Sequence, residues 1–150
     1  MKRGIKITRK KAQVELSFGM IFSIILIIAF LVVAFYAIKK FIDFRDKAQI
    51  ETFIDDLNSA IYKTWNSDQV SSKNVEYILP KKIESVCFTN KETKNFYLKL
   101  KNYVDRREIV HINIEKITYD EDPYCIENKN GKVKMILKKD SKESSVTITR

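Results

Sequence analysis

The sequence predicts an α+β protein in which one long N-terminal helix, first transmembrane and then amphipathic, is followed by a small antiparallel β-sheet or sandwich. Three observations predict this order. An uncharged apolar run spans residues 16–38, apolar residues then recur at helical spacing up to residue 65, and beyond residue 75 they alternate with polar ones. A chain of 150 residues with this layout has room for one modest domain after the helix.

The apolar run from Leu16 to Ile38, LSFGMIFSIILIIAFLVVAFYAI, covers 23 residues without a charged side chain. At about 1.5 Å per residue a helix of this length reaches about 34 Å, enough for a hydrocarbon core of about 30 Å. A cleaved secretory signal has a shorter apolar core, and a soluble core helix does not need so long a run. We therefore expect a retained single-pass membrane helix, with membrane lipid as its partner.

Residues 1–15 form a short, basic leader. Six of the 28 basic residues lie in it, and no acid precedes Glu15. Without residues 1–12, 22 basic residues remain against 19 acidic ones, so the net charge falls from +9 to +3. The excess charge is a membrane-flank signal, and we expect no nucleic-acid partner. Under the positive-inside rule it predicts a cytoplasmic N-terminus and an extracellular C-terminal domain, since the opposite flank carries only four basic residues.

The segment 39–66 is predicted to extend the helix as an amphipathic stretch. Neither glycine nor proline occurs between Gly19 and Pro80. From Ile50 onward the apolar residues recur at i, i+3, i+4 and i+7, which is typical of a helix with one buried face. This stripe can cover one face of the domain that follows, pack against copies of the same helix, or do both.

A β-domain is predicted over residues 75–150, after a polar loop at 66–74. Alternating apolar residues or short apolar runs bounded by turn residues predict strands at 75–79, 83–88, 96–100, 110–114, 124–127, 132–138 and 145–149. Asn130-Gly131 suits a type I′ turn, in which both central residues have positive φ. The sequence therefore predicts a hairpin between the strands on either side of this turn.

Two cysteines, Cys87 and Cys125, lie in the predicted β-domain. If that domain faces an oxidising medium, two cysteines in one small domain are expected to form a disulfide. Closing a loop of this length would stabilise the domain by about 4 kcal/mol in the chain-entropy model. Two reduced, buried thiols acting as small hydrophobes are the alternative.

No pattern in the sequence predicts a catalytic set, a metal site or a cofactor, and we expect no enzymatic activity. His111, the single histidine, lies on the polar face of a predicted strand without a nucleophile beside it in sequence. Asp120-Glu121-Asp122 lacks the alternate spacing of a calcium loop and is predicted to be a solvated turn. Six lysines on strands are expected to keep the domain soluble and to protect strand edges, with binding of an anionic surface or polymer as the alternative: Lys99, Lys101, Lys132, Lys134, Lys138 and Lys139.

The junction before the apolar run carries a more specific pattern. In Lys10-Lys11-Ala12-Gln13-Val14-Glu15-Leu16-Ser17-Phe18, two lysines and a small residue precede a glutamine, an acid and the uninterrupted helix. This pattern resembles the class III signal sequence of archaeal type IV pilin-like proteins. In that family a membrane peptidase cuts between the small residue and the glutamine, and the apolar segment is retained as the first half of a long helix.

By this resemblance the cut falls between Ala12 and Gln13, which becomes the new N-terminus. The family usually shows Gln, x, Ser, x, Glu, Phe, whereas here Glu15 and Ser17 occupy the exchanged positions and Phe18 matches. A carboxylate at the edge of an apolar helix is costly unless it is paired, and the new α-amino group of a neighbouring subunit is a ready partner. Glu15 is therefore a candidate assembly residue, with hydration at the headgroup level as the alternative.

The resemblance implies a structural subunit of a cell-surface filament or of a secretion-type pseudopilus. Its implied partners are a prepilin peptidase, an assembly ATPase and a membrane platform protein. Self-association would run through the N-terminal helix, where Gly19 and Ser23 form a small-xxx-small pair. The alternative function is a non-polymerising, single-pass membrane-anchored ectodomain with a binding role.

Overall fold

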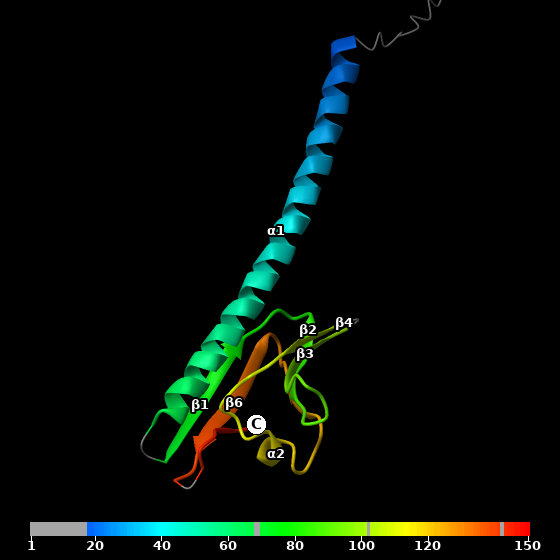
Figure 1. The fold of residues 1–150 in the computed structure, drawn as a ribbon. Coiled ribbons are helices and arrows are strands. Elements are labelled where there is room, and N and C mark those ends of the chain that lie inside the picture. The colour runs from blue at the N-terminus through cyan, green and yellow to red at the C-terminus, as the bar shows by residue number, and fades with distance from the viewer. Residues whose placement is uncertain (1–17, 68–69, 102, 142) are drawn as a thin grey trace, which may run out of the picture. The chain divides into compact units, whose positions relative to one another are not determined.

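The computed structural model describes residues 18–67, 70–101, 103–141 and 143–150. One long N-terminal helix is followed by two antiparallel sheets, which confirms the predicted α+β class (Figure 1). Contacts divide the chain into two compact units, one ending at Ile42 and the other running from Asp43 to Arg150. The elements in chain order are α1 (Phe18–Trp65), β1 (Ser71–Ile78), β2 (Ile83–Phe88), β3 (Phe96–Leu100), β4 (Tyr103–Arg107), α2 (Ile114–Ile117), β5 (Tyr124–Glu127), β6 (Lys132–Lys139) and β7 (Thr147–Thr149).

The first unit contains the part of α1 from Phe18 to Ile42. All of its side chains are exposed, and none is charged before Lys39. Isoleucine and valine slightly disfavour a helix in water, but in lipid a single segment must satisfy its backbone groups internally, and only a helix does so. Ser23 donates its hydroxyl proton to the carbonyl of Gly19 at 2.8 Å, so this polar group is also satisfied within the helix.

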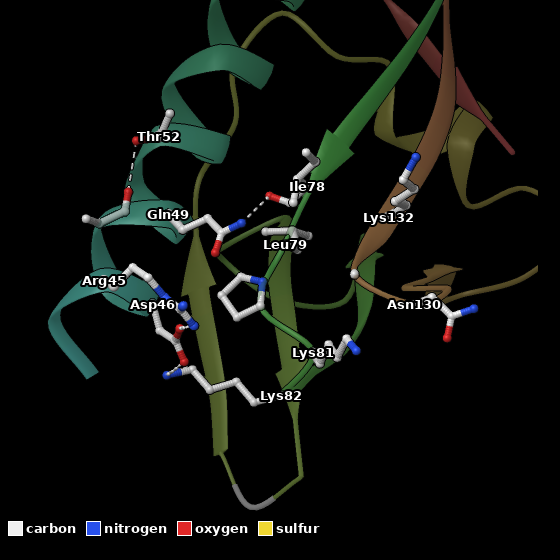
Figure 2. A pocket seen from close by; sticks show the side chains of 13 residues that line it. Arg45, Asp46, Gln49, Thr52, Ile78, Leu79, Lys81, Lys82, Asn130 and Lys132 are labelled. Atoms are coloured by element: carbon white, nitrogen blue, oxygen red, sulfur yellow. Dashed lines mark hydrogen bonds and ion pairs between the residues drawn. The ribbon is translucent and has the colours of Figure 1, made fainter. Parts of the chain in front are cut away.

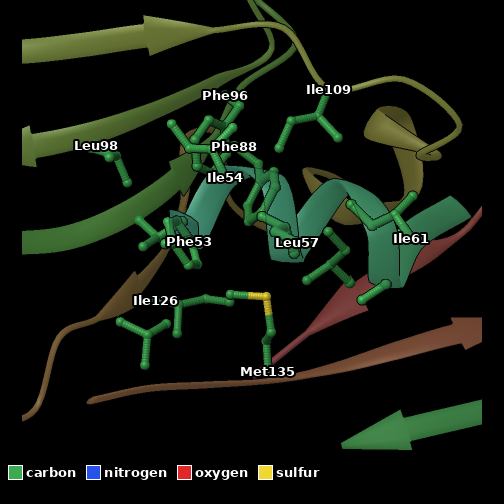
Figure 3. Packing of buried hydrophobic residues seen from close by; sticks show 14 of the residues in the cluster. Phe53, Ile54, Leu57, Ile61, Phe88, Phe96, Leu98, Ile109, Ile126 and Met135 are labelled. Atoms are coloured by element: carbon green, nitrogen blue, oxygen red, sulfur yellow. The ribbon is translucent and has the colours of Figure 1, made fainter. Parts of the chain in front are cut away.

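The second unit begins with the remainder of α1, which supplies one face of the core. Six apolar side chains at the predicted spacing are buried: Ile50, Phe53, Ile54, Leu57, Ala60 and Ile61. Phe53 contacts both sheets, since the centroid of its ring lies 5.1 Å from the ring centroid of Tyr77 on β1 and 6.4 Å from that of Phe96 on β3. The predicted use of the stripe, covering the domain that follows, is confirmed (Figure 3).

The strands form a three-stranded sheet in the order β1-β6-β7 and a four-stranded sheet in the order β4-β3-β2-β5. Every pair of neighbouring strands is antiparallel. On β6 the alternation is clear, because Val133, Met135 and Leu137 are buried whereas Lys132, Lys134 and Lys138 are exposed. The core between the sheets and α1 is built from such inward faces.

The predicted loop at 66–74 is wrong in its second half, because Ser71–Asn74 belong to β1 and pair with Ile136–Lys139 of β6. This part of β1 is polar on both faces and lies at a sheet edge. Backbone pairing alone therefore makes it a strand, without an apolar alternation. β4 was missed for a related reason, since it pairs only with β3 and its sequence, YVDRR, is mostly polar.

The predicted strand at 110–114 is also wrong. His111 has φ +63°, and the short helix α2 begins three residues later, at Ile114. Asn113 caps this helix by accepting a hydrogen bond from the backbone N–H of Lys116 at 3.1 Å. Ile112 forms an isolated bridge with Val146. The alternation of apolar and polar residues arises here in a connection that packs against the core.

The turn at Asn130-Gly131 is confirmed, with φ values of +56° and +84°. The hairpin around it is not, because Lys129 and Lys132 form one bridge and then the strands separate, β5 into the four-stranded sheet and β6 into the three-stranded one. A Cβ at Gly131 would lie 3.2 Å from the carbonyl oxygen of Leu79. Both its positive φ and this close approach favour glycine.

Candidate functional site

The apolar surface of the first unit is the most conspicuous functional feature. From Phe18 to Ile38 the helix exposes large apolar side chains on all sides, including Phe18 at 84% and Phe30 at 71%. Soluble proteins seldom expose contiguous apolar patches larger than a few hundred Å². α1 is the one helix in the described part of the chain that is long and apolar enough to cross a membrane. These properties are those of a membrane anchor.

The predicted processing and assembly residues, Ala12, Gln13 and Glu15, lie outside the described residues. Of the small-xxx-small pair, Ser23 bonds back to Gly19 in its own helix.

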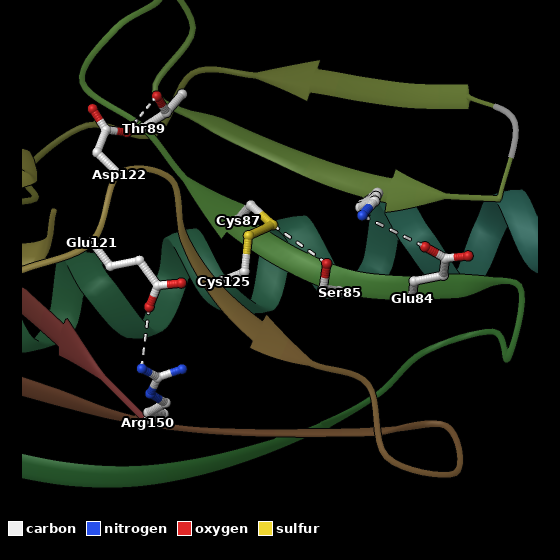
Figure 4. The surroundings of a disulfide bond; sticks show 9 residues. Glu84, Ser85, Cys87, Thr89, Glu121, Asp122, Cys125 and Arg150 are labelled. Carbon is white, nitrogen blue, oxygen red and sulfur yellow. Dashed lines mark hydrogen bonds and ion pairs between the residues drawn. A yellow bond between two sulfur atoms is a disulfide. The ribbon is translucent and has the colours of Figure 1, made fainter.

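Cys87 and Cys125 form the predicted disulfide, with the two Cα atoms 4.1 Å apart (Figure 4). The two residues lie directly opposite each other on β2 and β5. Cys87 is fully buried, and the hydroxyl of Ser85 lies 3.4 Å from its sulfur. The bond therefore ties the edge strand β5 to the centre of its sheet.

A depression of about 840 Å³ lies in the second unit where α1, the β1–β2 connection and the Asn130-Gly131 turn meet (Figure 2). Within it Asp46 is buried and forms ion pairs with Arg45 at 3.2 Å and Lys82 at 3.1 Å. Gln49 donates a hydrogen bond to the carbonyl of Ile78 at 3.3 Å. Together these contacts join the start of the second unit's helix to the end of β1.

Burial by itself raises the pKa of Asp46. Hydrogen bonds from Lys82 and Arg45 lower this pKa by more than burial raises it, so the pKa lies below its ordinary value. Asp46 is therefore a charged carboxylate at neutral pH. This network was missed at the sequence level, because Asp46 and Lys82 are 36 positions apart and neither segment specifies the other.

His111 lies in a connection and stacks on Trp65, with ring centroids 3.9 Å apart and planes 20° from parallel. Tyr62 is the next ring, 6.2 Å from His111. The indole N–H of Trp65 donates to the carbonyl of Ser144 at 2.7 Å. Through these contacts the end of α1 packs against the β4–α2 connection, which contains His111, and the β6–β7 connection, which contains Ser144.

The acidic run is held by neighbouring donors. Asp122 accepts a hydrogen bond from Thr89 at 2.7 Å, and Glu121 pairs with Arg150 at 3.2 Å. Within the described ranges, no three histidine, cysteine or acidic side chains come together as a potential metal site.

The six lysines predicted on strands do not form one group, and Lys101 lies in the β3–β4 connection instead of on a strand. Lys132 and Lys134 both pair with Glu76, Lys99 lies 3.9 Å from Glu84, and Lys139 donates to the carbonyl of Trp65 at the end of α1. These contacts place the lysines on different surfaces. The ion pairs that Lys132, Lys134 and Lys99 form lie at the surface and contribute little to stability.

Comparison of the chain with protein-family models, with curated proteins and with solved structures returned no match.

Proposed function

We propose that the protein is a membrane-anchored structural subunit that assembles with copies of itself in the manner of type IV pilin-like proteins. One observation carries the proposal. The same helix, α1, contains an apolar segment exposed on all sides and a stripe that is buried in the core of a β-domain. A helix of this kind is both the anchor and part of the folded domain.

A plain membrane anchor needs only an apolar span and a linker. In this chain α1 contains no glycine after Gly19 and no proline, and its residues from Ile38 to Ile50 are helical. The ion pairs of Asp46 hold the first turns of the second unit's helix against the β1–β2 connection. These features favour a domain that includes the end of α1 in its own core over a domain that follows the anchor through a separate linker.

The orientation that we propose puts the N-terminus in the cytoplasm and residues from Asp43 onward outside the cell. The leader supports this orientation with six basic residues. The disulfide between Cys87 and Cys125 supports it independently, because disulfides persist in oxidising compartments. In this orientation a prepilin peptidase would remove residues 1–12 on the cytoplasmic side, as the resemblance implies.

The first test is the intact mass and N-terminal sequence of the protein from the membranes of its own host. We expect a chain that begins at Gln13, allowing for cyclisation of the glutamine. A chain that retains Lys2 to Ala12 would contradict processing and would favour the non-polymerising, membrane-anchored ectodomain instead.

The second test is the substitution Glu15→Leu, with Glu115→Leu as the matched control at an exposed site on α2. We expect Glu15→Leu to abolish filaments seen by electron microscopy while the protein stays inserted in the membrane. The control should assemble normally. Normal filaments from Glu15→Leu would remove the proposed role of this carboxylate.

A further inference from the structure

The two ends of the β-domain carry opposite charge. Three connections, at residues 79–82, 101–102 and 128–131, contain four lysines and no acid. The connections at the other strand ends lie in the ranges 66–70, 89–95, 108–123 and 140–146, and their described residues include eight acids and three lysines. The first group of connections forms the basic end of the domain, and its cations are Lys81, Lys82, Lys101 and Lys129.

Backbone contacts show that the three basic connections lie together. The N–H of Leu79 donates to the carbonyl of Gly131 at 2.9 Å, which joins the first and third connections. The side chain of Asn128 donates to the carbonyls of Pro80 and Ile83 at 3.1 and 2.9 Å. Ile83 pairs with Leu100, so the β3–β4 connection follows directly beside the start of β2. The four lysines therefore gather at one end although they are far apart in sequence.

These lysines have donors left for a partner. Lys81, Lys101 and Lys129 are exposed and form no ion pair with any residue that the structure describes. Lys82 pairs with Asp46 but remains 40% exposed, and an ammonium group has three donors. Of the acids on neighbouring elements, Asp46 pairs with Lys82 and Glu84 with Lys99, while Glu127, directly before the third connection, is exposed and forms no ion pair with a described residue.

The basic end is also the end at which α1 enters the second unit. Near its start, Asp46 contacts Lys82 and Gln49 contacts Ile78, whereas its last residue, Trp65, contacts Ser144 at the opposite end. Asp43 follows the last residue of the apolar run, Ile38, by five positions. Five residues span at most about 18 Å, whatever the arrangement of the two units. The basic end therefore belongs to a domain whose first residue lies within this distance of the end of the apolar run.

We infer that the basic end binds the anionic headgroups of the membrane in which the chain's own helix is inserted. Cations close to an anionic bilayer are attracted to it within about a Debye length, and a tether raises the effective concentration of both partners. The acidic connections at the other end are repelled by the same surface, so both ends favour one orientation of the domain. This inference rests on the membrane anchor of the proposed function but not on polymerisation.

The experiment uses the full chain at one copy per nanodisc, in phosphatidylcholine alone or with about 30% phosphatidylglycerol. The readout is the acetylation rate of individual lysines, measured by mass spectrometry. In anionic discs we expect labelling of Lys81, Lys101 and Lys129 to slow about tenfold, and to recover at about 0.5 M salt. Lys63, Lys73 and Lys138 are exposed on other surfaces and serve as internal controls, with unchanged rates.

Two matched variants sharpen the test. In wild type the acetylation of Lys82 should also be slower in anionic than in neutral discs. In the triple variant Lys81→Gln, Lys101→Gln, Lys129→Gln, this difference at Lys82 should be lost. In the control variant Lys63→Gln, Lys73→Gln, Lys138→Gln, which removes the same charge elsewhere, the basic end should stay protected.

Equal labelling in neutral and anionic discs would overturn the inference. So would protection that appears only when several copies share a disc, which would identify a second copy of the chain as the partner. Failure of the anchor is recognised separately, because the chain would then not stay with discs of either composition.

Discussion

The two parts of α1 obey different rules although they belong to one helix. From Phe18 to Ile38 the side chains are apolar on every side and all are exposed. From Ile50 to Trp65 a stripe of apolar residues is buried, while the opposite face carries exposed charges such as Glu51, Asp55 and Lys63. A helix surrounded by lipid needs no polar face, whereas a helix that covers a core in water needs one.

Burial and hydrophobicity in this helix therefore have to be judged against the surrounding solvent. Leu31 and Leu57 are the same residue in the same helix, yet Leu31 is 51% exposed and Leu57 is fully buried. Leu57 contributes to the stability of the second unit by its contacts, whereas Leu31 contributes to insertion in the membrane.

The largest effect is expected from the disulfide. Replacing Cys87 and Cys125 by alanine should destabilise the second unit by about 4 kcal/mol, because the bond closes a loop between residues 38 positions apart. Insertion of the first unit in detergent or lipid should not change. Urea unfolding followed by the fluorescence of Trp65, the single tryptophan, measures the free energy of unfolding of the second unit. Carbonate extraction of membranes measures insertion of the first unit. Equal stability of variant and wild type would contradict a structural role of the bond.

The next effect compares the two leucines directly. Leu57→Ala should lower the free energy of unfolding of the second unit by about 3 kcal/mol, since it removes a buried side chain and leaves a cavity. Leu31→Ala is the matched control and should leave this quantity unchanged. The same urea titration, carried out in lipid nanodiscs, measures the free energy of unfolding of both variants. A similar loss in the two variants would mean that the two parts of α1 are not distinct in their packing.

A smaller effect is expected where the two parts meet. Asp46→Asn should destabilise the second unit by about 1–2 kcal/mol at pH 7, because it weakens the pairing with Lys82 and Arg45. The pKa of Asp46 is lowered in the folded state, so its contribution is complete above the unfolded value of 3.8 and is lost as the pH falls through the folded value.

The difference between wild type and Asp46→Asn should therefore be constant from pH 7 to 5 and shrink below pH 3.8. Unfolding titrations at several pH values measure it. A difference that persists unchanged at low pH would show that the loss comes from packing and not from the charge of the carboxylate.

The smallest effect is a gain. The hydroxyl of Tyr77 is buried against α1 and has no hydrogen-bond partner among the described residues. Burial and the nearby charge of Asp56 raise the pKa of Tyr77 to about 12. Tyr77→Phe should stabilise the second unit by about 0.5–1 kcal/mol, because it removes an unsatisfied polar group and keeps the ring beside Phe53. Destabilisation would indicate a bound water or another partner of this hydroxyl.

Local patterns predicted the elements that are decided by local chemistry. The strands at 83–88 and 124–127 have the predicted bounds, and the positive φ values at Asn130 and Gly131 follow from the turn preferences of that pair. The disulfide was predicted from the compartment alone. The network around Asp46 was not, since Lys82 is 36 positions away and nothing in either segment specifies the other.

The residues of single segments specify the uncharged span of α1, the stripe from Ile50 onward and the order of helix before sheet, because each depends on the solvent around that segment. Which strands are neighbours depends instead on contacts between segments that are far apart in the chain. β5 and β6 flank a well-formed turn and still join different sheets, and Ser71–Asn74 become a strand through pairing with β6. Strand pairing depends on hydrogen bonds between distant segments, which the residues of one segment do not encode. The same folding brings Lys81, Lys101 and Lys129 to one end of the domain.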